Sequence, residues 1–453
     1  MLGRSRRFAM LLTLVSIGVL VSAPSAGAAA LDPATNDPGL SAQWGLAAIG
    51  APQAWAVARG AGITVAVIDS GVDQQHEDLQ GRIAGTASCL DTSGDSTKCT
   101  DGTGNDDDGH GTHVAGIIAA AADNGRGIAG VAPDAKVLAI KVLREQGNGQ
   151  PPSGNASDVS AGIEYAIQHG AKVINLSLGS ITQSLLGPAF SAAINDAWNA
   201  GVVPVIAAGN DFILGSGFSN EPALVVDALN RAGTKASYSN GVGAAKWALA
   251  APGGEADDST SCTNSPNGVL STYWRPDNDV DAYACVAGTS MAAPHVAGAV
   301  AILLSAGLTP QAAVDRLLAT AHDLGQPGRD AIYGSGSVDV GAAVAGLTPS
   351  TTVPGATTQP TTDTTPETTT PLTSTSATSS PSVTSAPTST MPAPVVTLPS
   401  APTVRAHDTS PGTSSDDGVP PGLASVAVGL ALAVGTLSGW QLVRNAGWAR
   451  RTP

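Results

Sequence analysis

The chain has 453 residues, with 21 Lys and Arg against 36 Asp and Glu, and therefore a formal net charge of −15. Its length exceeds that of one small domain and suits one large domain with accessory segments. The excess of acid excludes a general nucleic-acid binder, because such proteins present a basic face to the phosphates. We therefore expect no nucleic-acid partner and an acidic surface that attracts cations.

Residues 1–30 have the pattern of a secretory signal peptide. Three arginines stand within the first seven residues, an apolar run extends over 8–21, and small residues lead to Ala28 and Ala30. A basic start, a short apolar centre and an A-x-A exit are typical of a signal that is removed. A retained membrane anchor is the alternative, but the apolar run is short for a membrane span. We predict that the chain is exported.

Residues 31–347 are predicted to form one α/β domain. Nearly continuous apolar strands alternate with helical stretches, which is typical of a mainly parallel sheet with helices on both faces. Such folds place their ligand sites beyond the carboxyl ends of the strands, so we expect the chemistry there. The predicted strands are 63–68, 136–142, 173–178 and 202–207, and the predicted helices are 111–122, 156–169 and 188–199.

Three segments carry residue types that suit nucleophilic catalysis. Asp69 ends the first strand, His110 stands at the mouth of a helix, and Ser290 begins another helix, with Pro294 expected in its first turn. Each has a structural alternative, since Asp caps turns and Ser caps helices. His110 and His113 are spaced to share a metal ion, but the glutamate of H-E-x-x-H is absent. The three segments together favour a nucleophile, a base and an acid acting as one unit.

These segments resemble the subtilisin-like serine proteases, the subtilase family. The resemblance rests on VIDSGV around Asp69, GHGTHVAG around His110 and GTSMAAPHVAG around Ser290, in the order Asp, His, Ser of subtilisin. It extends over residues 35–345, and the segment 36–55 is most similar to the thermitase-like branch. It implies a subtilisin-like fold and a serine endopeptidase, with Ser290 as nucleophile, His110 as base and Asp69 as the partner of the base.

The resemblance also implies roles around the substrate cleft. Asn210 is expected to donate a side-chain amide hydrogen to the oxyanion, together with the main-chain N–H of Ser290. His113 and His295 are expected to be structural. Two segments with small side chains are expected to pair their main chain with an extended peptide, although each can equally be the end of a core strand. These substrate-binding residues are Ser177, Leu178, Gly179, Ala207, Ala208 and Gly209.

By resemblance to thermitase-like enzymes, Asp37, Asp78 and Asn124 are expected to bind a structural calcium ion. The loop 121–128 would supply carbonyl oxygens, and hard oxygen ligands from distant parts of a chain suit Ca²⁺. The acidic run 106–108 is interpreted as a solvated loop, with a second ion site as the alternative.

Four cysteines lie in the predicted domain, and an even number suggests disulfides in an exported chain. Four cysteines can pair in three ways. We favour Cys89 with Cys99 and Cys262 with Cys285, because each pair closes a local loop rich in polar residues. A metal site is the alternative, but no C-x-x-C pair is present.

The C-terminal part is predicted to form a stalk and a membrane anchor. Ser, Thr and Pro make up 35 of the 50 residues in 351–400, so 348–421 is expected to be a disordered stalk. Residues 422–443 contain no charge and are long enough for one transmembrane helix. A sorting signal whose tail is removed is the alternative. The basic tail 444–453 is expected to stay in the cytoplasm, which would leave the protease outside the cell membrane.

The sequence thus predicts a monomeric serine endopeptidase on the surface of a bacterial cell, with proteins or peptides as substrates. Two alternatives stay open. Signal, protease, stalk and terminal helix together resemble the mycosins of actinobacterial type VII secretion, which favours a processing protease with one dedicated substrate. The other alternative is a non-enzymatic binding module on the same scaffold, against which the intact Asp69, His110, Ser290 and Asn210 argue.

Overall fold

A computed structural model describes most of the predicted protease domain. The predicted signal peptide, stalk, membrane helix 422–443 and tail lie outside the residues that it describes. Within the described part, no helix combines the length and the apolar character needed to cross a bilayer. The described residues are 35–146, 152–178, 187–211, 218–255, 262, 267–274 and 282–348.

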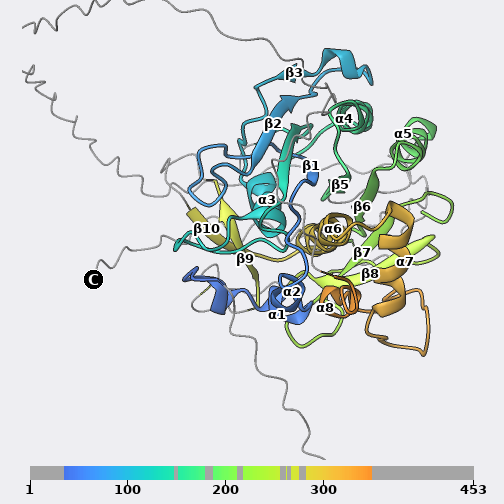
Figure 1. Cartoon of the computed structure of the whole chain (residues 1–453). Coiled ribbons are helices and arrows are strands. Elements are labelled where there is room, and N and C mark those ends of the chain that lie inside the picture. Colours follow the sequence, from blue (N-terminus) through green and yellow to red (C-terminus); the bar gives the residue numbers. More distant parts are fainter. Residues whose placement is uncertain are drawn as a thin grey trace, which may run out of the picture. The chain divides into compact units, whose positions relative to one another are not determined.

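A mainly parallel sheet forms the centre of the domain (Figure 1). Among the described residues its strands follow the order β3-β2-β4-β1-β5-β6-β7-β8, and only β2 and β3 pair antiparallel. A separate antiparallel pair consists of β9 and β10. The strands are β1 Thr64–Asp69, β2 Ile83–Ser88, β3 Thr100–Asp101, β4 Lys136–Lys141, β5 Val173–Leu176, β6 Val203–Ala207, β7 Leu224–Leu229, β8 Trp247–Pro252, β9 Val269–Tyr273 and β10 Ala282–Val286.

Helices cover both faces of this sheet, with α4 and α5 on one side and α3 and α6 on the other (Figure 1). Alternate side chains of β1 enter the two cores: Val65 and Val67 pack on the α3 and α6 side, and Ala66 and Ile68 on the α4 and α5 side. Burial on both faces explains why the strands are nearly continuous apolar runs. The helices are α1 Trp44–Ala48, α2 Ala51–Ala54, α3 His110–Ala119, α4 Ala156–Gln168, α5 Pro188–Asn199, α6 Thr289–Ser305, α7 Pro310–Thr320 and α8 Val340–Ala343, with 3₁₀ turns at Leu40–Ala42 and Ser96–Lys98.

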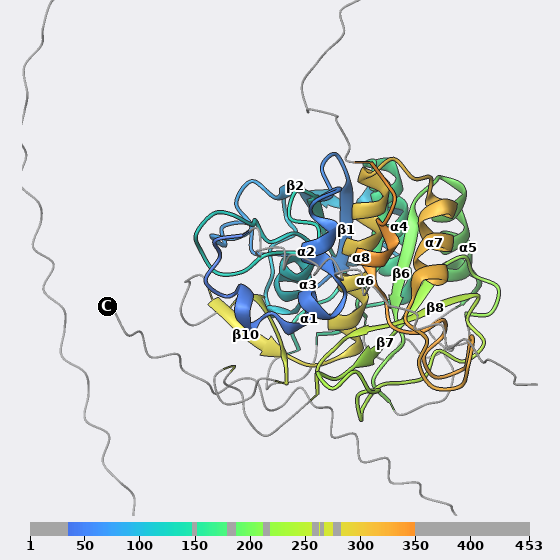
Figure 2. The same ribbon diagram turned by 60° about the horizontal axis from the view of Figure 1, so that its bottom comes forward.

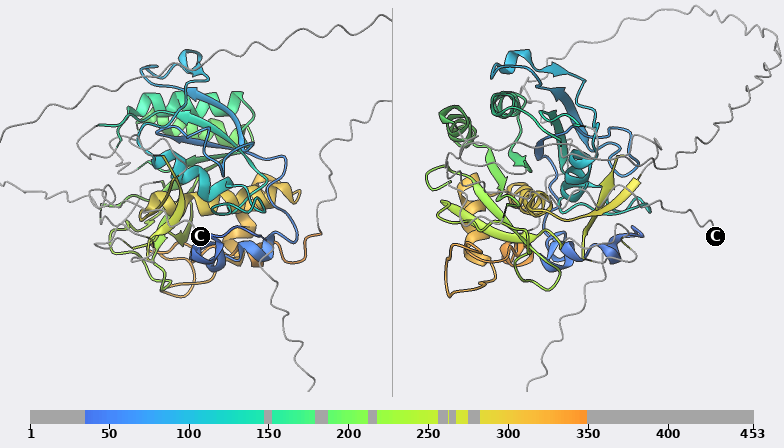
Figure 3. Two further views of the ribbon diagram at one scale, coloured as in Figure 1. Left: turned by 90° about the vertical axis from the view of Figure 1, so that its left-hand side faces the viewer. Right: turned by 180° about the vertical axis from the view of Figure 1, so that it is seen from behind.

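The helices α3 and α6 lie side by side in the middle of the molecule (Figure 2). Strand β9 packs against α3, as the rear view in Figure 3 shows. Gly116 of α3 permits this contact, because an added Cβ would collide with the hydroxyls of Ser271 and Thr272. Gly116 therefore lets α3, the helix that carries His110, sit deep in the core.

The predicted α/β fold is confirmed, with small shifts in the limits of the elements. The helix over 188–199 has the predicted limits, whereas the strand predicted over 173–178 ends at Leu176. The expectation for Pro294 is wrong, because it is the sixth residue of α6 and so lies in the second turn. A proline there cannot donate to the carbonyl of Ser290, four residues earlier.

Two disulfides join the four cysteines in the pairing that the local loops favour. Cys89 is bonded to Cys99 and Cys262 to Cys285. The first closes the loop between β2 and β3, and the second ties β10 to the segment before β9. A cysteine metal site is therefore not formed.

Candidate active site

The structure brings Asp69 and His110 together at the carboxyl end of the sheet. Asp69 is the last residue of β1 and His110 the first of α3. His110 Nδ1 lies 2.7 Å from Asp69 Oδ1, and the two side chains are 3% and 0% exposed. The N–H of Ser70 also donates to Asp69 Oδ1, at 2.7 Å. The carboxylate thus selects the tautomer of the imidazole with hydrogen on Nδ1 and fixes the plane of the ring.

The charge of Asp69 also alters the acidity of His110. Burial opposes protonation of the ring, but the charge and hydrogen bond of Asp69, with help from Asp108 and Asp106, outweigh it and raise the pKa of His110 above its usual value. The imidazolium is therefore stabilised at this position. A histidine that accepts a proton and holds it briefly suits general acid–base catalysis.

Ser290 is the second residue of α6 and is almost fully buried. Its Oγ donates to the carbonyl of Ser177 at 3.1 Å. In return, the hydroxyl of Ser177 donates to the carbonyl of Ser290 at 2.8 Å. That carbonyl is the one that Pro294 leaves without a helical donor, so the proline within α6 creates the acceptor that holds Ser177 against the start of the helix.

Asn210 lies next to the start of α6 and is held by its oxygen. The main-chain N–H and the hydroxyl of Thr289 both donate to Asn210 Oδ1, at 3.0 and 2.9 Å. The same hydroxyl accepts the N–H of Gly209 at 3.1 Å. Since the oxygen is fixed by two donors, the amide hydrogens of Asn210 are turned towards other acceptors. A side-chain amide held through its oxygen would suit the oxyanion role that the resemblance implies.

The predicted cleft residues are mainly buried. Ser177, Leu178, Ala207 and Ala208 are each less than a tenth exposed, and Gly179 lies outside the described residues. In the second segment the main-chain N–H groups of two residues are already hydrogen-bonded within the domain. Ala208 donates its N–H to Val226 and Gly209 donates to Thr289. Val226 of β7 and Thr289 at the start of α6 accept these two N–H groups. The main chain just before Asn210 is thereby fixed in place.

The three predicted calcium ligands meet at one loop after α3. Asp37 accepts the N–H of Asn124 at 3.2 Å, and the Asn124 amide donates to Asp78 at 2.8 Å. Asp78 is fully buried and Asp37 nearly so. Tyr283 and the N–H of Ile128 also donate to Asp78, at 2.9 and 2.8 Å. The loop therefore joins carboxylates that are far apart in the sequence.

This donor set fits a calcium ion. Among the described residues, no Lys or Arg forms an ion pair with either Asp37 or Asp78. No group of three or more His, Cys, Asp or Glu occurs there, so main-chain and amide oxygens would complete the set, as Ca²⁺ permits. Gly127 makes room, because an added Cβ would collide with the Asp78 carboxylate. In the structure Asn124 donates through Nδ2 to Asp78. To bind a metal ion, its side-chain amide would rotate so that Oδ1 faces the ion.

Sequence reasoning missed the role of Asp106. The interpretation of 106–108 as a solvated loop is wrong for this residue, which is only 6% exposed. Its carboxylate accepts hydrogen bonds from Ser70 and Thr112 and from the main chain before α3. The signal in the sequence was its place four residues before the first residue of a helix, where a carboxylate is favoured by unpaired N–H groups.

Two further buried histidines, His113 and His295, have structural contacts. His113 Nε2 lies 3.1 Å from the carbonyl oxygens of both Val269 and Ala284, so this nitrogen donates to the β9–β10 pair and does not bind a metal with His110. His295 Nδ1 contacts the carbonyl of Met291 at 2.8 Å. Burial lowers the pKa of His113 to about 3 and that of His295 to about 4. Both rings are therefore neutral at pH 7.

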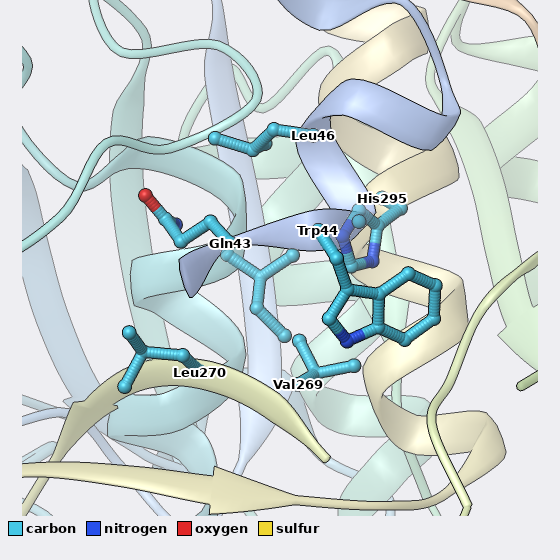
Figure 4. A pocket seen from close by; sticks show the side chains of 8 residues that line it. Gln43, Trp44, Leu46, Val269, Leu270 and His295 are labelled. Atoms are coloured by element: carbon cyan, nitrogen blue, oxygen red, sulfur yellow. The ribbon is translucent and has the colours of Figure 1, made fainter. Parts of the chain in front are cut away.

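A small pocket lies between α1, α3, β9 and α6 (Figure 4). It is lined mainly by apolar side chains. Its cavity volume is about 10 Å³, close to the least that one water molecule needs. It is too small for a peptide and contains none of the predicted catalytic or cleft residues. The residues around it are Gln43, Trp44, Gly45, Leu46, Ile117, Val269, Leu270 and His295.

The chain is similar to known proteins over most of the described domain. Residues 60–336 match the profile described as the subtilase family. Thermitase from Thermoactinomyces vulgaris is 40% identical over 278 residues, which cover 60% of this chain and 86% of thermitase. Subtilisin DY from Bacillus licheniformis is 40% identical over 293 residues, which cover 63% of this chain and 92% of the subtilisin.

A solved structure is also similar. It is described as proteases from Pseudoalteromonas arctica PAMC 21717 and aligns with a TM-score of 0.59 at 33% identity, covering 69% of this chain and 99% of that one. The family profile covers more than half of the chain, and the relatives are serine proteases matched over most of their length. The chain therefore belongs to the subtilase family and is a serine endopeptidase that acts on proteins or peptides.

Proposed function

We propose that Asp69, His110 and Ser290 form the catalytic triad of this endopeptidase. The 2.7 Å hydrogen bond between Asp69 and His110 carries the proposal, since a buried, oriented imidazole is what a serine nucleophile needs. His110 takes the proton of Ser290 as the Oγ attacks the scissile carbonyl, and returns it to the leaving amine. Asp69 keeps the ring in its tautomer and stabilises the imidazolium. Water then hydrolyses the acyl-enzyme by the same route.

The tetrahedral intermediate needs donors for its oxyanion. Asn210 Nδ2 and the main-chain N–H of Ser290 are assigned this task. The two hydrogen bonds from Thr289 to Asn210 Oδ1 support this assignment. They fix the amide in advance, so the donor does not have to reorient during the reaction. Ser290 Oγ must leave the carbonyl of Ser177 to attack, which requires only a rotation of its side chain.

Labelling with a fluorophosphonate tests the triad. The full chain should be labelled once, at Ser290, and Ser290→Ala and His110→Ala should lose the label. Ser305→Ala is the matched control, because this serine is on the same helix and lies at its far end. A label on another residue, or no label on folded protein, would contradict the assignment.

Calcium is proposed as a structural cofactor, with Asp37, Asp78, Asn124 and carbonyls of the loop 121–128 as ligands. When bound, the ion would supply only charge neutralisation and cross-linking of these segments. The buried carboxylates and their fit to hard oxygen coordination support this assignment.

Export and anchoring are proposed from the sequence. The signal pattern at 1–30 and the uncharged segment 422–443 would place the protease outside the membrane of a bacterial cell on one helix. The topology predicts that protease added to intact cells removes the domain and leaves a short membrane-bound fragment. A domain released into the medium without added protease would contradict anchoring.

The breadth of substrates separates a general endopeptidase from a dedicated processing enzyme. The geometry of the triad is the same in both, so a peptide library is the appropriate measurement. A general enzyme cleaves casein and many library peptides, whereas a dedicated one leaves casein intact and cleaves a narrow set.

A further inference from the structure

Asp69 and His110 come from different elements, so their alignment depends on what joins β1 to α3. Ser70, which follows Asp69, accepts the N–H of Gly111 on its Oγ at 3.0 Å. The same hydroxyl donates to Asp106 Oδ1 at 2.8 Å. One buried hydroxyl beside Asp69 is thus bonded to the residue after His110 and to the segment before it.

The carboxylate of Asp106 accepts several hydrogen bonds from groups at the start of α3. Oδ1 accepts the main-chain N–H groups of Asp108 and Gly109 at 3.0 Å each, besides the hydroxyl of Ser70. Oδ2 accepts the N–H and the hydroxyl of Thr112 at 2.9 and 2.6 Å. Five donors surround this buried carboxylate, which is the favoured arrangement at the positive end of a helix.

Close packing makes this junction rigid. Gly111 must be glycine, because an added Cβ would collide with the carbonyl oxygen of Gly71. Lys141, which pairs with Asp69 in the β1–β4 register, donates through Nζ to the carbonyl of Ser70 and to Asp107. The segment after Asp69 is therefore held both by the neighbouring strand and by α3.

We propose that Asp106, acting through the hydroxyl of Ser70, is a positioning residue that keeps Asp69 and His110 aligned for catalysis. The inference rests on the proposed triad and adds to it a group that touches neither substrate nor the reacting atoms. Without the hydroxyl, Asp106 still caps α3, but the start of α3 is no longer tied to the residue beside Asp69. The distance between the carboxylate and the imidazole then varies.

Ser70→Ala tests the link, and Thr112→Val is its matched control. Each change removes one hydroxyl that donates to Asp106 and accepts one main-chain N–H, from Gly111 in the case of Ser70 and from Asp73 in the case of Thr112. Only Ser70 adjoins Asp69. Both variants are made in the full chain, and rates are divided by the number of sites that react with a fluorophosphonate, so that unfolded protein does not count.

We expect Ser70→Ala to lower kcat about 10- to 100-fold, with KM changed less than about twofold, because misplacement of catalytic groups acts on the chemical step. The acid midpoint of kcat/KM should move to lower pH as His110 loses support from Asp69. The ionisable groups around His110 are Asp69, Asp106, Asp108 and His113, and the substitution changes none of them. Thr112→Val should lose similar thermal stability while kcat and the midpoint stay near the wild-type values.

Two results would overturn the positioning role alone. Ser70→Ala could match the wild type in kcat and midpoint, or Thr112→Val could lose as much kcat as Ser70→Ala, which would make the effect one of general stability. Both of these leave the wild type labelled at Ser290 and the triad intact. A folded wild type that takes no label would overturn the triad together with the positioning role.

Discussion

Among the described residues the side chain of Asn210 is held through its oxygen, and this defines what its removal should do. Thr289 holds its oxygen by two hydrogen bonds, at 3.0 and 2.9 Å, while the proposed role belongs to its nitrogen. Asn210→Ala should lower kcat about 100- to 1,000-fold with little change in KM, because the donor acts on the transition state. This range is the one measured for the corresponding donor in subtilisin, a relative of this chain.

Steady-state kinetics check this expectation. Asn230→Ala serves as the control, because Asn230 Oδ1 accepts the N–H groups of Ala232 and Thr234 in an exposed turn after β7. Equal changes in kcat for the two variants, or a rise in KM alone for Asn210→Ala, would rule out the oxyanion role.

After Asp69, Asp108 is the carboxylate whose charge raises the pKa of His110 most. It accepts the N–H of His110 at 3.2 Å. Burial raises the pKa of Asp108 to about 6, although the charge of His110 opposes this. Ionised Asp108 favours the imidazolium, so Asp108→Asn removes a negative charge and lowers the pKa of His110. The acid midpoint of kcat/KM should fall by roughly half a pH unit, equivalent to about 0.7 kcal/mol.

The shape of the profile gives a second measurement. In the wild type the charges of Asp108 and His110 affect each other's pKa, so the acid limb should be broader than a single titration. In Asp108→Asn it should narrow to one titration. A midpoint that rises, or that stays in place, would contradict this electrostatic coupling.

At the scale of the element, β7 contains an acid that the fold has buried without a partner. Asp227 pairs in register with Ala250 of β8 and is fully buried, and within the described structure neither carboxyl oxygen has a hydrogen-bond partner. Burial raises the pKa of Asp227 well above its usual value; the charge of Lys235 lowers it and that of Asp330 raises it. A protonated, neutral carboxyl is the favoured form in this strand.

Asp227→Asn should therefore gain stability relative to the wild type as the pH rises. Because the folded pKa is raised, the wild type has the full contribution of this group below its unfolded pKa of 3.8 and loses it as the pH rises towards the folded pKa. In that interval each pH unit costs about 1.4 kcal/mol, or about 3–6 °C in Tm at about 2–4 °C per kcal/mol.

Thermal melts from pH 4 to pH 8 measure the difference in Tm between variant and wild type. The difference should grow in favour of Asp227→Asn with rising pH. Asp196→Asn, an exposed acid on α5, should show no such trend. A difference that is constant over the whole range would mean that Asp227 is ionised in the folded protein.

The elements of the sheet could be predicted because their patterns are local. Apolar runs gave β1, β4 and β6 to within one residue at each end. The prediction for Pro294 was wrong by one turn, because the helix already begins at Thr289 and Pro294 is its sixth residue. The contacts of Asp106 could not be predicted, because one partner, Ser70, lies 36 positions away in the sequence. No local sequence pattern connects the two residues. The charge of Asp227 within an apolar run was the signal that could have marked it.

At the scale of the whole molecule, the proposed calcium site joins three separate segments. Asp37 precedes the first helices, Asp78 follows β1, and Asn124 follows α3, the helix that begins with His110. Hydrogen bonds already link all three. An ion that binds only the folded form stabilises it by an amount set by its concentration relative to Kd. The site would therefore act on the stability of the fold and leave the chemical step to the triad.

Removal of calcium should lower Tm by about 10 °C. The reason is mass action: free calcium at a thousand times Kd contributes about 4 kcal/mol, and each kcal/mol corresponds to about 2–4 °C. Melts in excess chelator and in millimolar calcium give the shift, and Asp78→Ala should melt at the same temperature in both. Asp134→Ala, which removes an acid that pairs with Arg59, should keep the full shift. A wild type whose Tm is the same in chelator and in calcium would show that the carboxylates are stabilised by their hydrogen bonds alone.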